Sequence, residues 1–288
     1  MKSSISSYSF AYLMENQNET QISVISKAKE LGFDAIEFTD LTPPENVSES
    51  EYAKQLRAEA ERVGIEISGY SIGADLLSGC NGNLEKEIER IKAKVDIAEI
   101  LGVKLLRHDA SFSFPNNDRS YNGFVNVLDR LAEGCRKVTE YAETKGIKTM
   151  VENHGFFAQD SDRVEALVNR VAHRNFGLQL DIGNFLCVDE NPATAVGRCA
   201  PYAFNAHVKD FIFKSGEEGF VGEGFIFTRG GNYIRGTILG HGIVPIKQCV
   251  SILKANGYDG YLTLEFEGFE RIDFALQQGS EYIKRLIG

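Results

Sequence analysis

Four ionisable residues stand where short apolar segments of strand length end, all in the second half of the chain. In order, they are Glu152, Asp181, His207 and Glu265. Parallel strands end where loops open to solvent and substrate, so an ionisable residue at that point is typical of an active site. In a barrel of parallel strands the carboxyl ends all face one mouth, which would bring the four residues together.

Three carboxylates and an imidazole at one place predict a metal site. Carboxylates that share a site repel one another and raise one another's pKa values, and a divalent cation removes that cost. Oxygen ligands with one imidazole suit Mn²⁺, Mg²⁺ or Co²⁺ better than a thiolate-type zinc site. Taken singly, Glu152 or Glu265 could be an ion-pair partner, His207 a core histidine and Asp181 a loop cap. All four at consecutive strand ends favour the metal site.

A repeated order of helix, glycine and strand would position these residues. Strands are predicted over residues 4–10, 35–39, 66–70, 104–107, 148–151, 177–180, 204–207 and 261–265. Helices are predicted over residues 18–31, 51–63, 84–101, 121–145, 162–171, 192–200, 245–256 and 272–287. Eight strands alternating with eight helices predict an α/β fold, a (β/α)8 TIM barrel that forms a single domain over residues 1–288. A doubly wound sheet is the alternative.

The segment at about residues 211–241 interrupts this order. It is rich in glycine and phenylalanine and too long for a simple connection. We expect it near the barrel mouth as a lid or a small hairpin, and a surface excursion at an oligomer contact is the alternative. Lys209 and Asp210 precede it, and either they pair with each other or they touch the substrate.

Composition restricts the expected partners. The formal net charge is −10, and an acidic surface repels phosphate backbones, so nucleic acid is not an expected partner. No apolar run reaches the roughly 20 residues that span a bilayer, and the first residues lack the apolar core of a signal peptide. The five cysteines are scattered and read as reduced thiols. We expect a cytoplasmic protein that binds no membrane.

Several short motifs stand at or near the predicted strand ends. They are Val-Glu-Asn-His-Gly at 151–155, Leu-Asp-Ile-Gly-Asn at 180–184, His-Val-Lys-Asp at 207–210, Gly-His-Gly-Ile-Val at 240–244 and Leu-Glu at 264–265. Together these motifs resemble those of the sugar phosphate isomerase/epimerase superfamily, the xylose isomerase-like TIM barrel group. The resemblance implies a bound divalent metal, first of all Mn²⁺, with Mg²⁺, Co²⁺ and Zn²⁺ as alternatives. It also implies that Glu152 and Glu265 exchange a proton with the substrate as well as bind the metal, whereas Asp181 and His207 are ligands only.

The sequence also departs from the ketose 3-epimerases of this group. The position three residues after the metal-binding aspartate is commonly histidine there and is Asn184 here, and the insertion before Glu265 is long. Further substrate contacts are expected at the ends of other strands and in the insertion. They are Glu37, Tyr70, Arg107, His108, His154, Asn184, Lys209 and Arg235. A phosphorylated and a free substrate are not distinguished, and we expect a homodimer or a homotetramer.

The leading hypothesis is a metal-dependent isomerase or epimerase. It would act on a small sugar or sugar-derived ketone by proton abstraction next to a carbonyl, through an enediolate. A sugar or inosose dehydratase, a lyase that uses the same enolate, is the nearest alternative. Less favoured are a non-catalytic sugar-binding barrel and a nuclease of the endonuclease IV type, whose site of three zinc ions needs more histidines than the five of this chain.

Overall fold

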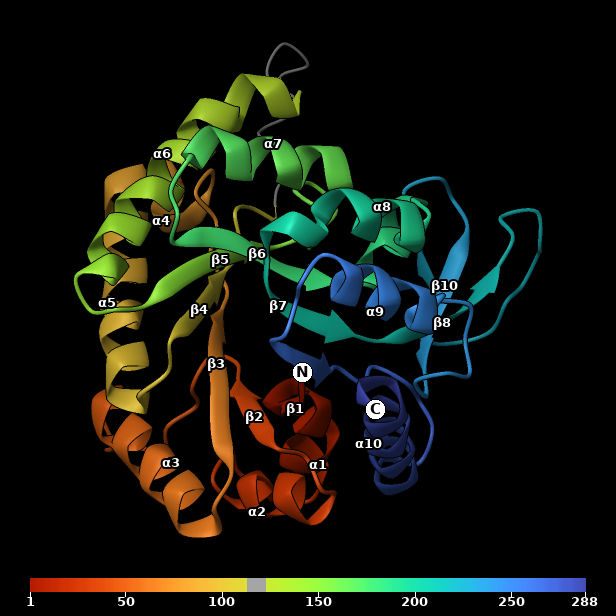
Figure 1. Cartoon of the computed structure of the whole chain (residues 1–288), viewed down its shortest axis with the longest axis horizontal. Coiled ribbons are helices and arrows are strands. Elements are labelled where there is room, and N and C mark those ends of the chain that lie inside the picture. Colours follow the sequence, from red (N-terminus) through yellow and green to blue (C-terminus); the bar gives the residue numbers. More distant parts are fainter. Residues whose placement is uncertain (113–122) are drawn as a thin grey trace.

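Parallel strands close into a barrel in the computed structural model, which describes residues 1–112 and 123–288. In chain order they are β1 (Lys2–Ser6), β2 (Ala35–Phe38), β3 (Glu66–Ile72), β4 (Leu105–His108), β5 (Lys148–Glu152), β6 (Phe176–Asp181), β7 (Ala203–Val208) and β11 (Tyr261–Leu264). The order around the barrel is β1-β11-β7-β6-β5-β4-β3-β2 (Figure 1). The predicted (β/α)8 barrel is confirmed.

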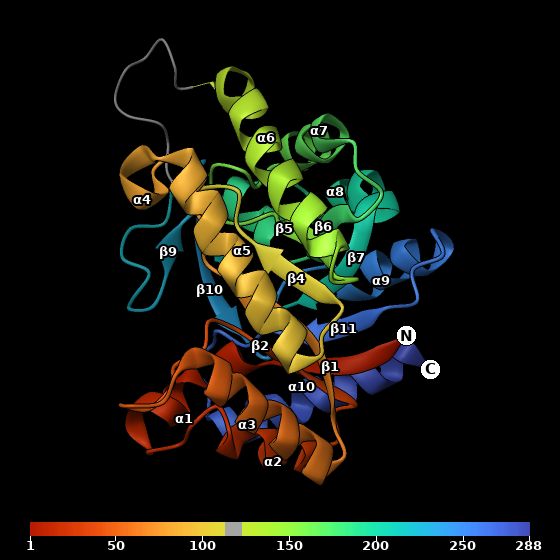
Figure 2. The same ribbon diagram turned by 90° about the vertical axis from the view of Figure 1, so that its left-hand side faces the viewer.

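Helices surround the barrel on its outside, and the two termini lie side by side (Figures 1 and 2). The α-helices are α1 (Ala11–Asn16), α2 (Ser23–Glu30), α3 (Glu49–Val63), α4 (Gly79–Gly82), α5 (Leu84–Leu101), α6 (Phe124–Glu143), α7 (Ser161–Val171), α8 (Pro192–Cys199), α9 (Ile246–Ala255) and α10 (Ile272–Ile287). Short 3-10 helices cover Ser7–Phe10, Asn184–Val188 and Ala200–Tyr202. Within the described residues, none of these helices is long and apolar enough to cross a membrane.

Local sequence signals explain where the longer helices begin and end. The Ser48 hydroxyl accepts a hydrogen bond from the Glu51 N–H at 3.2 Å and caps α3. Asn83 caps α5 in the same way through the Lys86 N–H at 3.0 Å. Gly64 ends α3 in the left-handed conformation, which a glycine adopts without a steric penalty.

Side chains alternate between the barrel interior and the helix layer along each strand. Ile36, Leu178 and Leu180 are fully buried in the apolar core that the barrel shares with its helices. The residues next to such apolar positions along the strands face inward, and many of them are polar. For example, the Asn205 amide on β7 donates to Glu37 on β2 at 2.9 Å, across the barrel. This polar interior lies directly beneath the strand ends.

Several boundaries differ from the prediction by two residues or more. The first strand ends at Ser6 rather than at residue 10, because Ser6 caps a 3-10 turn by accepting from the Tyr8 N–H at 3.3 Å. Strand β3 continues to Ile72, two residues beyond its predicted end. Helix α2 begins at Ser23 rather than at residue 18. The predicted helix start at Tyr121 lies outside the described residues, within which α6 begins at Phe124.

The segment after β7 forms a small antiparallel sheet. It contains β8 (Asp210–Lys214), β9 (Ile226–Phe227) and β10 (Tyr233–Thr237) in the order β8-β10-β9. Figure 1 places β8 and β10 beside the barrel, on the side of α8 and α9. This sheet occupies most of the segment that we predicted to be an insertion.

Asp210 fixes the return of the chain from this sheet to α9. Its buried carboxylate accepts from the backbone N–H groups of Phe211, Gly240, Gly242 and Val244 at 2.8–3.0 Å. A Cβ at Gly242 would lie 2.2 Å from the Asp210 Oδ1, so only glycine allows this approach. The predicted pairing of Asp210 with Lys209 or with substrate is therefore wrong, because the backbone uses the carboxylate.

Replacing Asp210 by alanine should destabilise the protein by about 3 kcal/mol, because buried N–H groups then lose a charged acceptor. Urea unfolding at pH 7 measures the change in the free energy of unfolding. Asp273→Ala, which breaks an exposed ion pair with Arg271, is the control and should change stability by less than about 1 kcal/mol. Equal stability of Asp210→Ala and the control would contradict this account.

Candidate active site

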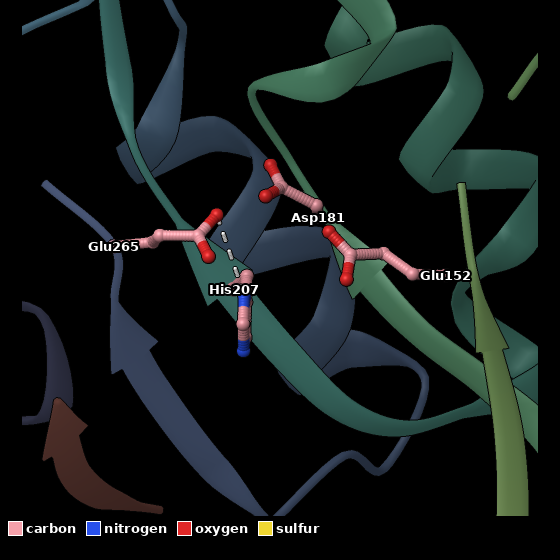
Figure 3. Close-up of side chains that lie close together, drawn as sticks. All are labelled: Glu152, Asp181, His207 and Glu265. Atoms are coloured by element: carbon pink, nitrogen blue, oxygen red, sulfur yellow. Dashed lines mark ion pairs between the residues drawn. The ribbon is translucent and has the colours of Figure 1, made fainter. Parts of the chain in front are cut away.

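The four residues predicted to bind a metal lie together at the carboxyl ends of the strands. Glu152, Asp181 and His207 belong to β5, β6 and β7, and Glu265 directly follows β11. Each offers a ligand atom, and these atoms lie within 4.8 Å of one another. Figure 3 shows the four side chains pointing toward one centre, with Glu152 and Glu265 on opposite sides of it. Asp181 is fully buried, and Glu152 and His207 are nearly so.

The donor set fits a divalent cation. The His207 Nε2 faces Glu37 at 3.0 Å, which leaves Nδ1 directed toward the cluster. This Nδ1 is buried and lies 3.7 Å from the Glu265 Oε2, too far for a hydrogen bond, and it has no hydrogen-bond partner among the described residues. A buried polar atom without a partner is costly, and coordination of a cation satisfies it. Three carboxylates and one imidazole nitrogen are ligands that Mn²⁺, Mg²⁺ and Co²⁺ accept.

Glu37 positions His207 from below and is not free to contact substrate as predicted. This fully buried carboxylate accepts from the Ser71 hydroxyl at 3.0 Å and from the Asn205 amide at 2.9 Å, in addition to His207. A carboxylate behind a ligating histidine fixes the ring orientation and the tautomer. Although Glu37 lines the base of the cavity, its oxygens are engaged with protein groups.

Two amides beneath the cluster were missed by sequence reasoning. Gln179 donates to the Glu152 Oε2 at 3.0 Å and accepts from Asn205 at 3.1 Å. Each stands two residues before a ligand, Gln179 before Asp181 and Asn205 before His207. Since alternate residues of a strand share one face, this spacing could have identified both.

Glu152 is held ionised and oriented. Its Oε2 lies 2.8 Å from the Arg107 Nε, and its Oε1 accepts from the Asn184 amide at 3.0 Å. Burial alone would raise the pKa of Glu152, but the charges of Arg107 and His207 outweigh burial and lower this pKa below its usual value. Arg107 and Asn184, both predicted as substrate contacts, thus touch a predicted ligand.

His154 lies beside Glu152 and is oriented by Asp109, which the sequence did not single out. The His154 Nδ1 is 2.9 Å from the Asp109 Oδ1, and Arg107 binds both oxygens of the same carboxylate at 2.7 and 2.9 Å. Burial lowers the pKa of His154, yet the hydrogen bond to Asp109 outweighs it and the pKa is raised. The His154 side chain remains 41% exposed and lines the cavity.

Lys209 contributes a buried positive charge to the cluster. Its Nζ lies 3.1 Å from Asp181 and 3.2 Å from Glu267, and it also pairs closely with Glu265. Burial raises the pKa of Asp181 to about 6, although Lys209 opposes the shift. At Glu265 the neighbouring positive charges prevail instead. Burial raises the pKa of Glu265, but Lys209 and His207 outweigh burial and hold this pKa well below its usual value. Glu267 was not predicted from the sequence.

Three predicted substrate contacts are not brought to this site. The Tyr70 hydroxyl donates to Glu49 on α3 at 3.0 Å, and the His108 ring lies near Phe176. Both side chains point toward the helix layer, because each is next to an inward-facing residue of its strand. The Arg235 guanidinium stacks over Phe225 at 5.2 Å, on the β8-β10-β9 sheet.

A cavity of about 250 Å³ opens over the cluster and is lined by Glu37, Arg107, Glu152, His154 and Lys209 among others. Tyr8, Asp40 and Glu267 complete its rim. A larger cavity of about 1020 Å³ lies between α1 and α10 and contains none of the four predicted ligands. The chemistry therefore belongs to the smaller cavity.

Removing the charge behind His207 should weaken metal binding. Glu37→Gln is expected to lower the affinity for Mn²⁺ by about 10-fold to 100-fold, because the His207 ring loses the carboxylate that orients it. Isothermal titration calorimetry of metal-stripped protein measures this affinity. Glu49→Gln, on the outer side of the same region, is the control. An unchanged affinity in Glu37→Gln would show that Glu37 does not support a metal ligand.

Solved structures of related fold cover nearly the whole chain. The D-psicose 3-epimerase from Clostridium cellulolyticum H10 aligns with a TM-score of 0.73 at 19% identity, over 100% of this chain and 99% of that one. The probable 3-DHS dehydratase from Bacillus anthracis aligns with a TM-score of 0.73 at 19% identity, over 99% of each chain. A protein from Mycobacterium smegmatis in complex with magnesium aligns with a TM-score of 0.70 at 20% identity, over 92% of this chain and 87% of that one. These likenesses concern the fold.

Curated relatives share a part of the sequence. The inosose dehydratase of Clostridium beijerinckii is 28% identical over 163 residues, which are 55% of this chain and 54% of that protein. The chain thus spans about half the length of the curated relatives it matches. Residues 25–286 match the family described as xylose isomerase-like TIM barrel. This match extends over most of the chain and agrees with the closed barrel and its strand-end cluster, so the protein belongs to the xylose isomerase-like TIM barrel family.

Proposed function

We propose that the protein is a divalent-metal-dependent isomerase or epimerase that acts on a small sugar or a sugar-derived ketone. One observation carries the proposal: Glu152 and Glu265 approach the same centre from opposite sides. A carboxylate on each face of a substrate can remove a proton from the carbon next to a carbonyl and return a proton on the other face.

The surrounding residues support this division of roles. Glu152, Asp181, His207 and Glu265 would hold a divalent cation, which would supply positive charge beside the substrate oxygens. Arg107, Gln179 and Asn184 hold the Glu152 carboxylate in place. His207 and Lys209 do the same for Glu265.

Charge and size favour a small uncharged substrate. Among the described residues of the cavity, Arg107 is paired with Asp109 and Glu152, and Lys209 is paired with three carboxylates. A phosphate group would therefore meet no uncompensated cation on the described cavity wall. The cavity of about 250 Å³ is also smaller than the roughly 300–1,000 Å³ of pockets that hold drug-sized ligands. A free monosaccharide or a cyclic polyol ketone meets both conditions.

A dehydratase is the second candidate, and His154 favours it. Elimination needs a group that can assist a leaving β-hydroxyl, besides the carboxylate that removes the proton. His154 lines the cavity two residues from Glu152, and Asp109 fixes its Nδ1 so that Nε2 can face the substrate. The partial match to inosose dehydratases adds support.

Deuterium exchange tests the proton transfer that both candidates share. Metal-loaded protein is incubated in D₂O with a panel of free ketoses and inososes, and substrate deuteration is followed by mass spectrometry. Glu152→Gln and Glu265→Gln should each slow exchange by about 10²–10⁴-fold, the usual contribution of a general acid or base. Glu281→Gln on α10 is the control and should exchange at the normal rate. Metal content is measured in each variant, so that loss of the cation is not mistaken for loss of the base.

The product then separates the two candidates. An epimer or isomer keeps the mass of its substrate, whereas a dehydratase product has lost one water. Absence of both exchange and mass change with every substrate in the panel, in protein that carries a divalent cation, would contradict the proposed function. A binding role without catalysis would then explain the site better.

A further inference from the structure

The turn at residues 228–232, between β9 and β10, reaches across to two loops of the active site. Asp189 binds this turn: its carboxylate accepts from the Thr228 hydroxyl at 2.7 Å, from the Asn232 amide at 2.8 Å and from the Gly230 N–H. The Arg229 N–H donates to the Cys187 carbonyl at 2.8 Å. The turn is therefore attached to the 3-10 helix Asn184–Val188, whose first residue binds Glu152.

The Arg229 side chain reaches a different loop, the one between β5 and α7. Its guanidinium donates to the Phe156 carbonyl and pairs with Asp160, the residue before α7. This loop begins directly after the predicted ligand Glu152 and carries His154. One arginine from the inserted sheet thus contacts the loop that shapes one wall of the cavity.

The contacted loop has a conformation that needs external support. Phe156 has a φ of 63°, in the left-handed region that a bulky residue rarely adopts, and Gly155 before it has a φ of 78°. The Phe156 N–H donates to the Gln159 side chain at 2.5 Å, while its carbonyl receives Arg229. Hydrogen bonds on both sides of Phe156 therefore hold this backbone in place.

The same turn determines where His154 lies. The His154 backbone pairs with Ala158 in an isolated antiparallel bridge, which closes the loop around Phe156. The Gln159 side chain donates to the Asn184 carbonyl at 2.6 Å, so the loop is also joined to the neighbouring active-site segment. A shift of the Phe156 peptide would move His154 relative to Glu152 and to Asp109.

We propose that residues 228–232 brace the substrate cavity, and that Arg229 is a positioning residue for His154. The inference rests on the proposed function only where turnover is concerned. Arg229 touches neither the four predicted ligands nor any other group of the cluster, so it acts through the loop after β5. Because Asp189 and Cys187 hold the turn independently, removing the Arg229 side chain takes one support from the loop and leaves the turn attached.

Arg229→Met tests the brace, with Lys214→Met on β8 as the matched control, since Glu218 is the one ion-pair partner of Lys214 within residues 1–112 and 123–288. Hydrogen–deuterium exchange of the backbone amides of residues 154–160 is measured in metal-loaded protein. Arg229→Met should speed exchange of this segment by about fivefold or more, because local opening becomes easier. Exchange in the control should match the unchanged protein. Equal exchange in both variants would overturn the brace, whether or not a substrate is known.

Kinetics test the positioning role. With the substrate found by the deuterium screen, Arg229→Met should lower kcat/KM by roughly 10-fold to 100-fold, because a displaced group loses alignment with the substrate. The Mn²⁺ affinity should stay within about twofold of normal, and Arg229→Lys, which keeps one charged donor, should recover part of the loss. Faster exchange with normal kcat and KM would overturn the positioning role.

The two proposals fail in different ways. If the unaltered protein turns over no substrate, the proposed function is contradicted, and amide exchange alone decides whether Arg229 holds the loop. If the unaltered protein is active and Arg229→Met has normal kinetics and normal exchange, the function stands and the brace is rejected.

Discussion

Three carboxylates and an imidazole converge within 4.8 Å in a buried place, and this concentration of negative charge governs the rest of the site. Such a cluster is stable only if positive charge compensates it. Arg107 and Lys209 supply part of that charge from β4 and from the end of β7. Glu37, Gln179 and Asn205 then fix the orientation of the groups from below.

The barrel accommodates this concentration of charge because one face of each strand packs against the helices and the other face carries the polar groups. Outward-facing residues such as Leu178 and Leu180 stabilise the fold against the helices, so the inward-facing positions beside them can be polar. The inserted sheet contacts the loops after β5 and β6 and so joins them to each other on one side of the cavity. The strands thus carry the cluster, and the inserted sheet contacts the loops beside it.

The fold and the convergence of Glu152, Asp181, His207 and Glu265 could be predicted from the sequence, because each depends on local signals. Helix caps such as Ser48 and Gly64, short apolar segments and an ionisable residue at the ends of four strands are all visible in the chain. The prediction that Tyr70 and His108 face the barrel mouth was wrong. Each residue is next to an inward-facing position of its strand, so the alternation of side chains directs it toward the helices. The same alternation would have revealed Gln179 and Asn205.

Other features depend on contacts between distant segments, and no local pattern encodes them. The pairing of Asp109 with His154 spans two strands, and that of Lys209 with Glu267 spans 58 residues. Arg229 lies 73 residues from the Phe156 carbonyl it binds. A glycine-rich and phenylalanine-rich segment shows that an insertion exists, but the partner of one arginine within it requires the folded structure.

The most direct test of this account is the metal content of the purified protein beside His207→Ala, measured by elemental analysis after growth in metal-replete medium. The account predicts one divalent cation per chain in the unaltered protein and a large loss in the variant, because the Nδ1 of His207 is then missing from the donor set. Equal metal content in the two proteins, or none in either after addition of Mn²⁺, Mg²⁺ or Co²⁺, would contradict the central claim that this cluster is a metal centre.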